Sequence, residues 1–236
     1  MNKTLKIIPK EVNSSEFINI RPASEFVPEW YRLSNSSINN SPFELTTDGG
    51  SKNHSTYKKC SPFFDAMTSG YIAFLTADIE VIRKEDGSQF IAFRTMRQII
   101  TEHHPLQWQG LPVPSGYTPF VFKWHSQFGF FTPKDYSLFF TNPVNRFDLP
   151  FYTISGVVDT DKYDLPIHFP FFIKKDFFGI IEKGTPIAQI IPIKRDSWSR
   201  EIEKEDINKA QLKLDKYLST IKRSYKNNFW TKKEYR

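Results

Sequence analysis

The sequence predicts a mainly β protein, and three observations carry that prediction. Short segments rich in Ile, Val, Phe and Tyr, which suit a pleated sheet, recur along the first 196 residues. Clusters of Gly, Pro, Asn and Asp separate these segments, as turns separate strands. A sustained helical spacing of apolar residues occurs only after Asp196. We therefore expect a β-rich core domain over residues 1–196 and a helical region over residues 197–236.

The first 60 residues are expected to contain little regular structure. Residues 1–12 alternate between apolar and polar side chains well enough for one edge strand. Two prolines between Arg21 and Tyr31 forbid a long helix, and the sequence PEWY at residues 28–31 predicts a single helical turn. Asn, Ser, Gly and Thr are frequent in residues 34–59, which predicts a long exposed loop.

Strands are expected to dominate from Gly70 to Ile193. The apolar segment from Gly70 to Val81 is followed by the turn sequence EDGS and by a second apolar segment at residues 89–94. This order predicts a β-hairpin, because a glycine-containing turn joins two segments of strand composition. Further strands are expected over residues 120–124, 129–131 and 136–141.

Residues 197–236 are the basic end of the chain and are expected to contain an amphipathic helix. Apolar residues recur at spacings of three and four from Ile207 to Tyr225, and Ser199 or Asp206 can cap the first turn. We expect the apolar stripe to pack on the body of the protein, with a partner protein or a membrane surface as the alternative. Most of the net charge of +6 resides here, so the basic face is either solvated or in contact with nucleic acid.

The composition restricts the compartment and the kinds of site. Cys60 is the only cysteine, so we expect no internal disulfide and no cysteine cluster for zinc; this favours the cytoplasm, or the host cytoplasm for a phage protein. His103, His104 and His125 lack the regular spacing of metal ligands, so no metal site is expected. The first residues lack a secretory signal, and the apolar segments reach only about half the length of a bilayer-spanning helix. We therefore expect no membrane association through a spanning helix.

Residues 154–193 carry the most chemical information. The sequence GVV leads to Asp159 at the end of a strand, a polar turn follows, and a second strand returns. This pattern predicts a β-hairpin with Asp159, Asp161 and Tyr163 at its tip, where functional side chains are commonly mounted. A second strand pair is predicted over residues 179–193, where a glycine turn interrupts the apolar sequence.

This segment resembles the superfamily of dUTPases and dCTP deaminases. The resemblance is carried by the sequences GVVDTDKY at residues 156–163 and GTPIAQII at residues 184–191. It implies a dUTPase-like β-clip, or a related distorted β-barrel or jelly roll, assembled as a homotrimer with nucleotide pockets at the subunit interfaces. It also implies that Asp159 orients the water that attacks the α-phosphate, and that Tyr163 packs against the deoxyribose. Mg²⁺ would accompany such a nucleotide.

Three further residues complete the candidate site. Arg146 is a candidate phosphate contact, or else it forms a salt bridge with Asp148 or Asp159. Asp161, like Asp159, either contacts the ligand or accepts backbone hydrogen bonds in the turn. Gln189 either contacts the ligand or is a buried hydrogen-bonding residue of its strand. Two features of dUTPases are missing here: the serine of the phosphate motif and the glycine-rich C-terminal arm.

The whole chain also resembles uncharacterised phage and bacterial proteins that combine PEWY, FTNPVNRFDLPFYTISGVVDTDKY and GTPIAQIIP. The sequence therefore predicts a nucleotide-binding protein, which acts as a deoxynucleotide pyrophosphohydrolase if Asp159 activates water. The alternative is a non-catalytic phage assembly or host-interaction protein that retains the scaffold.

Overall fold

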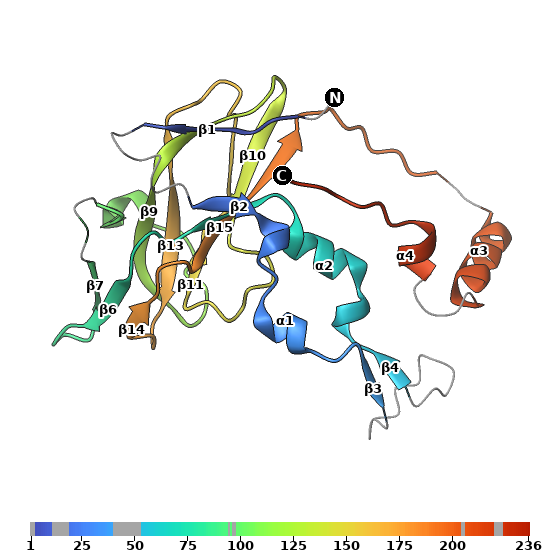
Figure 1. The fold of residues 1–236 in the computed structure, drawn as a ribbon, viewed down its shortest axis with the longest axis horizontal. Helices are drawn as coiled ribbons and strands as arrows, with labels where there is room; N and C mark the ends of the chain where they lie inside the picture. Colours follow the sequence, from blue (N-terminus) through green and yellow to red (C-terminus); the bar gives the residue numbers. More distant parts are fainter. Residues whose placement is uncertain are drawn as a thin grey trace.

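The computed structural model describes residues 3–10, 19–39, 53–93, 95, 98–203, 206–219 and 224–236. The predicted mainly β class is confirmed, because these residues form several antiparallel sheets with short helices to one side (Figure 1). None of the sheets in this part of the chain closes into a barrel. No helix among the described residues has the length and apolar character needed to cross a membrane.

The first large sheet is built around one long strand. Its order is β1 (Lys6–Pro9), β9 (Tyr117–Phe131), β13 (Pro166–Lys174) and β11 (Phe151–Thr153), and β8 (Ile100–Glu102) also pairs with β9. The edge position of β1 agrees with the prediction. The strands predicted at residues 120–124 and 129–131 are both parts of β9. The strand continues between them because β13 pairs with β9 on both sides of this point, at His125 and at Gly129.

The second large sheet brings distant parts of the chain together. Its order is β12 (Gly156–Val158), β10 (Tyr136–Thr141), β15 (Pro186–Lys194), β5 (Tyr71–Phe74) and β2 (Ile20–Pro22). Strand β10 spans the residues that the sequence predicted. Tyr136 is paired with Lys194 at one end of the β10–β15 ladder. Arg195, which follows β15, therefore lies beside the beginning of β10.

Two smaller sheets account for the remaining strands. One contains β14 (Gly179–Ile181), β6 (Ile79–Arg83) and β7 (Gln89–Phe93), and the other contains β3 (Ser37–Asn39) and β4 (Asn53–Ser55). The predicted hairpin is confirmed as β6 and β7, although residue 94 lies outside the described residues. The loop predicted over residues 34–59 is wrong where β3 pairs with β4, and residues 40–52 also lie outside the described part of the chain.

Residues 70–81 were predicted as one strand and instead form β5 and β6, which belong to different sheets. The chain leaves the second large sheet after β5. The N–H of Leu75 donates to the Thr185 carbonyl, and the N–H of Gly184 donates to the Leu75 carbonyl. These two bonds replace further pairing with β15, so the continuous apolar composition conceals a change of sheet.

Both strand pairs predicted within residues 154–193 are wrong. Strand β12 pairs with β10, whereas β13 pairs with β9 and β11, so the chain passes from one large sheet to the other at residues 159–165. In the same way, β14 pairs with β6, whereas β15 pairs with β10 and β5. An alternating pattern identifies strands but does not specify their partners, which tertiary packing selects.

The main core lies between the two large sheets. Both sheets contribute side chains that are at most 1% exposed, including Trp124, Phe130 and Phe171 from the first and Leu138 and Ile190 from the second. The rings of Trp124 and Phe171 are stacked, with centroids 3.7 Å apart and planes inclined by 6°. Burial of each such side chain stabilises the folded state by about 1.5–3 kcal/mol. The packed sheets thereby fix the position of the turn that crosses between them.

Two short helices precede β5. Helix α1 (Glu29–Leu33) confirms the helical turn predicted from PEWY. Helix α2 (Ser61–Thr68) was not predicted; it has Pro62 in its first turn, where a missing N–H costs nothing, and it buries Met67. It ends just before Gly70, which has a φ of +70°.

The predicted C-terminal helix is present as α3 (Ile207–Ser219) and α4 (Ser224–Asn228). Asp206 caps α3, since its side chain accepts a hydrogen bond from the N–H of Asn208 at 2.9 Å. The expectation that the apolar stripe packs on the body is wrong for Ile207 and Leu214, which are 82% and 48% exposed. Residues 220–223, within the predicted stripe, lie outside the described residues.

The chain after α4 returns to the body of the protein (Figure 1). The indole N–H of Trp230 donates to the Asp65 carboxylate of α2 at 2.8 Å. The ring of Tyr235 packs edge-on against Tyr71 of β5, with centroids 6.0 Å apart. We call residues 224–236 the C-terminal segment. It contacts the body through specific aromatic and ionic groups, whereas the exposed apolar residues of α3 do not.

Candidate functional site

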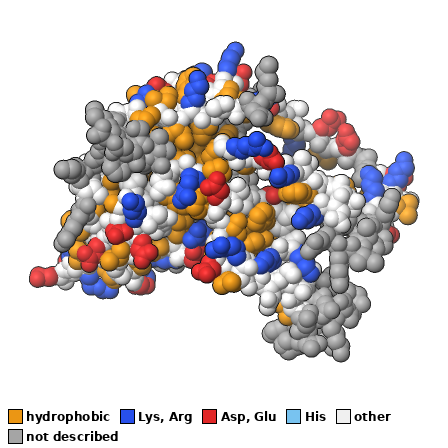
Figure 2. Space-filling view, viewed as in Figure 1, with side chains coloured by type: hydrophobic (Ala, Val, Ile, Leu, Met, Phe, Trp, Pro, Cys, Tyr) orange, Lys and Arg blue, Asp and Glu red, His pale blue; other side chains and the backbone are white. Residues whose placement is uncertain are grey.

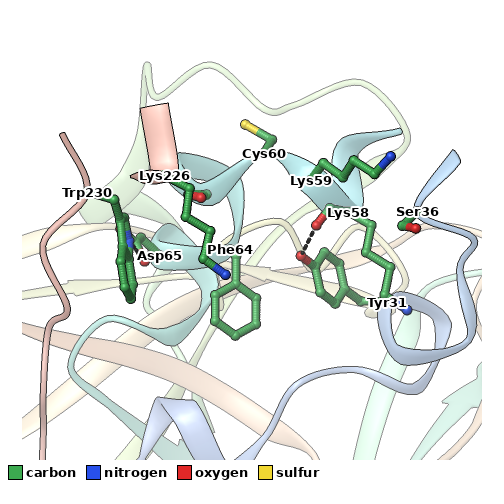
Figure 3. Close-up of a pocket in the computed structure, with 10 residues that line it drawn as sticks. Tyr31, Ser36, Lys58, Lys59, Cys60, Phe64, Asp65, Lys226 and Trp230 are labelled. Atoms are coloured by element: carbon green, nitrogen blue, oxygen red, sulfur yellow. Dashed lines mark hydrogen bonds between the residues drawn. The ribbon is translucent and has the colours of Figure 1, made fainter. Parts of the chain in front are cut away.

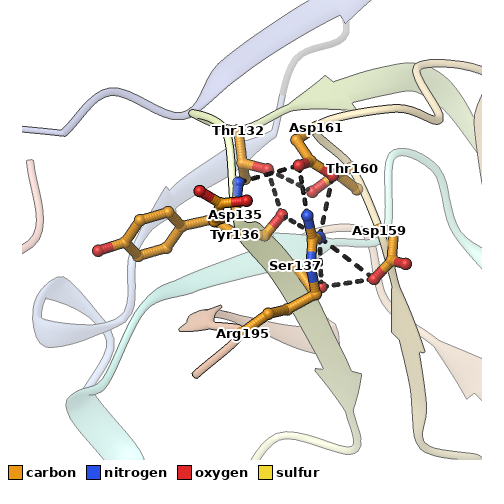
Figure 4. A network of polar contacts seen from close by, with 8 residues as sticks. All are labelled: Thr132, Asp135, Tyr136, Ser137, Asp159, Thr160, Asp161 and Arg195. Atoms are coloured by element: carbon orange, nitrogen blue, oxygen red, sulfur yellow. Dashed lines mark hydrogen bonds and ion pairs between the residues drawn. The ribbon is translucent and has the colours of Figure 1, made fainter. Parts of the chain in front are cut away.

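The turn between β12 and β13 has a well-defined backbone. Thr160 is fully buried, and its hydroxyl lies 2.9 Å from the hydroxyl of Thr132 (Figure 4). The N–H groups of Lys162 and Tyr163 both donate to the Asp159 carbonyl at 3.0 Å. The buried Thr160 separates Asp159 from Asp161, and both carboxylates face Arg195.

Asp161 forms the central ion pair of this turn. Its carboxylate binds both Nη atoms of Arg195, and the Nη1 bond is 2.9 Å long. The N–H of Asp135 donates to the same carboxylate at 3.0 Å, and the Asp161 side chain is 5% exposed. The hydrogen bond from Arg195 is the main reason that the pKa of Asp161 is lowered to about 2. Asp161 is therefore ionised at neutral pH and fully engaged by the protein.

Asp159 is held on one side and open on the other. The Ser137 hydroxyl donates to its Oδ1 atom at 2.6 Å, and Arg195 Nη1 lies 3.3 Å from the same atom. The Asp159 side chain is nevertheless 56% exposed. Figure 4 shows the carboxylate projecting from the end of β12 with one oxygen directed away from these donors. We call Ser137, Asp159, Asp161 and Arg195 the carboxylate cluster.

The ion pair between Asp161 and Arg195 predicts a defined pH dependence of stability. The pKa of Asp161 is lower in the folded protein, at about 2, than its ordinary value of 3.8. The pair therefore stabilises the fold above pH 3.8, and this contribution is lost as the pH falls toward 2. We expect Arg195→Gln to lower the free energy of unfolding at neutral pH and to lose this effect near pH 2, as measured by urea unfolding at both pH values.

Lys194→Gln is the matched control for that experiment. Lys194 is next to Arg195 in the sequence and pairs with Asp196, but both side chains are about half exposed. Exposed pairs contribute little to stability, so this variant should match the wild type at both pH values. Equal destabilisation by Arg195→Gln at pH 7 and pH 2 would show that the charge pair is not the cause.

Tyr163 lies on the same turn as Asp159. It is joined to Asp159 by the backbone hydrogen bond described above, and its side chain is 43% exposed. Its ring is thus partly exposed on the turn that carries Asp159. Of the predicted site residues, Asp159, Asp161 and Tyr163 are brought together by this turn.

Arg146 is engaged elsewhere. Its Nε and Nη2 atoms donate to the Asp148 carboxylate at 2.8 and 2.7 Å, in the fork geometry that arginine forms with a carboxylate. Of the alternatives that the sequence left open, the structure contains the salt bridge to Asp148. The guanidinium group is thereby occupied within its own loop.

Gln189 is fully buried in β15 and uses its amide to join three segments. Its nitrogen donates to the carbonyls of Ala66 and Ser69, at 2.9 and 2.7 Å, and its oxygen accepts from the N–H of Val144 at 2.9 Å. These bonds attach the end of α2 and the loop after β10 to the second large sheet. The side chain has no exposed surface for a ligand in this structure.

Sequence reasoning missed two members of the carboxylate cluster, Ser137 and Arg195. One signal was available. Arg195 directly follows the last predicted strand, and charged residues at strand ends commonly form polar contacts. Its partner, Asp161, is 34 residues earlier in the sequence, and the pairing of β10 with both β12 and β15 brings the two together.

The histidines lie outside the carboxylate cluster. His125 accepts or donates a hydrogen bond with the Thr101 hydroxyl at 2.7 Å, and its ring lies 4.3 Å from that of His168. Burial, followed by the neighbouring His168, lowers the pKa of His125 to about 4, so it is neutral at neutral pH. Within the described ranges, no group of three or more His, Cys, Asp or Glu side chains is arranged to hold a metal.

No protein-family model matches the chain, and no curated protein matches it. The contacts in the carboxylate cluster are therefore the physical basis for assigning a function.

Proposed function

We propose that the protein binds a nucleotide at the turn that carries Asp159 and Tyr163. One observation carries this proposal: Asp159 is oriented by Ser137 and Arg195, yet more than half of its side chain is exposed. Because its orientation is already fixed, this carboxylate loses little conformational entropy when a ligand binds. The resemblance of residues 154–193 to dUTPases supports the choice of a nucleotide.

The charge of the carboxylate cluster points to Mg²⁺ as part of the bound species. Asp159 and Asp161 together carry one negative charge more than Arg195 neutralises. A bare triphosphate would be repelled by this excess. Mg²⁺ keeps most of its water ligands, and Asp159 would hold it through a bound water, which leaves the carboxylate free to act as a base.

The proposed reaction is hydrolysis between the α- and β-phosphates of a deoxynucleoside triphosphate. Asp159 accepts a proton from water as the water oxygen bonds to the α-phosphorus. Pyrophosphate then leaves, and the nucleoside monophosphate remains. Tyr163 provides the surface against which the deoxyribose packs.

A specific observation favours a second candidate, a non-catalytic assembly or interaction protein. Arg146 and Arg195 are both bonded to carboxylates, so neither presents an open guanidinium fork to a phosphate. The exposed apolar residues of α3, including Ile207 at 82%, offer surface to a protein partner. Recovery of the protein as a stoichiometric component of a virion, without any effect of nucleotide, would support this candidate.

Thermal unfolding separates the two candidates. A nucleotide at about 100 times its Kd stabilises the folded state by about 2.7 kcal/mol, which raises the Tm of a domain of this size by about 5–10 °C. For at least one deoxynucleoside triphosphate, we expect the Tm to rise by this much more with Mg²⁺ than in EDTA, and Asp159→Asn to lose that difference. If none of the four common deoxynucleoside triphosphates raises the Tm at millimolar concentration with Mg²⁺, nucleotide binding at Asp159 is excluded.

A further inference from the structure

A cavity lies between α2 and the C-terminal segment. Its volume is about 350 Å³, within the range of small-molecule sites. Its lining residues include three lysines, Lys58, Lys59 and Lys226, and three aromatic residues, Tyr31, Phe64 and Trp230. None of the lining residues belongs to the carboxylate cluster. We call this space the lysine cavity (Figure 3).

One wall of the lysine cavity is anchored to the body of the protein. Tyr31 of α1 is 5% exposed, and its hydroxyl donates to the Lys58 carbonyl at 3.2 Å. The rings of Tyr31 and Phe64 lie 5.6 Å apart. The ammonium group of Lys58 donates to the Ser34 carbonyl at 2.7 Å, which holds its long side chain against α1. This wall is therefore ordered before any ligand binds.

The other wall is supplied by the C-terminal segment. Asp65 accepts hydrogen bonds from the Trp230 indole and from Lys233, which attach the segment to α2. Lys226 lies over the Trp230 ring, with its nitrogen 5.8 Å from the ring centroid. In Figure 3, Lys226 extends from the side of Trp230 toward Phe64, across the cavity.

The charge inside the lysine cavity is positive. Asp65 is the one acidic side chain in its lining, and it is already bonded to Trp230 and Lys233. Within the described part of the chain, no carboxylate forms an ion pair with Lys58, Lys59 or Lys226. On the face seen in Figure 2, basic and hydrophobic side chains lie next to each other in the region of α1, α2 and the C-terminal segment.

We propose that the lysine cavity binds a mononucleotide, a phosphate-bearing ligand with a planar ring, independently of the carboxylate cluster. Lysine ammonium groups bind phosphate as point charges. Lys59 and Lys226 would supply two of them, and Lys58, which is held by the Arg32 and Ser34 carbonyls, adds positive charge to the wall. Trp230 and Phe64 offer ring faces on which a base can stack. The volume matches a single nucleotide, and the proposal goes beyond hydrolysis at Asp159 because it uses different residues and no metal.

Calorimetric titration in EDTA tests this proposal without interference from a Mg²⁺-dependent site. The probes are ATP and UTP, the corresponding nucleosides, and inorganic tripolyphosphate. We expect at least one nucleotide to bind, and its nucleoside and tripolyphosphate each to bind about ten-fold more weakly or worse, because each lacks one of the two kinds of contact. Asp159→Asn should give the same Kd as the wild type in EDTA.

Paired substitutions identify the residues responsible. Lys59→Gln combined with Lys226→Gln removes two charges from the lysine cavity, and we expect the Kd of the nucleotide to rise by about ten-fold or more. Lys232→Gln is the control, because Lys232 is in the C-terminal segment but is 71% exposed and pairs with Glu234. Thermal unfolding of each variant establishes that it is folded.

Several results would overturn the proposal. They are the absence of nucleotide binding in EDTA, an unchanged Kd in the double variant, and equal binding of nucleoside and nucleotide. A single-stranded oligonucleotide that binds more than about ten-fold tighter than either mononucleotide would assign the lysines to nucleic acid instead. Failure of the Mg²⁺-dependent Tm shift leaves these measurements unaffected, so the two sites are tested separately.

Discussion

Replacing Asp159 with asparagine is expected to reduce deoxynucleotide hydrolysis by about a hundred-fold to ten-thousand-fold and to leave the fold intact. Asparagine retains an oxygen that can accept the hydrogen bond from Ser137, but it cannot accept a proton from water. The side chain is 56% exposed, so its substitution should change the free energy of unfolding by less than about 1 kcal/mol. Pyrophosphate release and urea unfolding, measured on the same preparation, check both parts.

Asp164→Asn provides the matched control for Asp159→Asn. Asp164 is on the same turn and carries the same charge, but it pairs with Lys10 at 2.8 Å and is 48% exposed. Its substitution changes the local net charge as much as Asp159→Asn does, without removing the proposed base. A specific role for Asp159 would be contradicted if Asp159→Asn hydrolysed the nucleotide at the wild-type rate. It would also be contradicted if both variants lost the same fraction of the hydrolysis rate.

The sequence could locate the chemically important turn because its signals are local. An apolar sequence that ends in Asp159 and a polar turn that precedes Pro166 are adjacent in the chain, and the structure places Asp159, Asp161 and Tyr163 together. Arg195 could not be found in this way. Its contact with Asp161 depends on the register of β10 with both β12 and β15, strands that are distant in the sequence.

The same distinction explains which parts of the fold were predictable. Strand β10 and the hairpin of β6 and β7 were found because alternation and turn composition are properties of neighbouring residues. The predicted partners of β12, β13, β14 and β15 were wrong. Each of these strands pairs with a strand other than its neighbour along the chain. Helix α2 is only eight residues long, so its periodicity was too short to stand out from the surrounding loops.

Gln189 illustrates why one residue type allows two interpretations in the sequence. A glutamine within an apolar strand can contact a ligand or satisfy buried backbone groups, and composition does not distinguish these roles. In the structure its amide binds the Ala66 and Ser69 carbonyls and the Val144 N–H. These backbone groups are distant in the sequence from Gln189, so no local pattern could reveal that they need a partner.

Gly70→Ala is expected to lower the free energy of unfolding by about 3 kcal/mol or more. The residue has a φ of +70°, and a Cβ atom would lie 2.1 Å from the Ile190 carbonyl oxygen of β15. Since β15 is paired on both sides, the backbone cannot move away without disturbing β10 or β5.

Gly87→Ala is the control. Its φ is +81°, but nothing lies within 4 Å of the new Cβ, so this substitution should lower the free energy of unfolding by only about 1–2 kcal/mol. Urea unfolding of both variants separates contact from backbone strain, and equal losses would show that β15 yields to the methyl group.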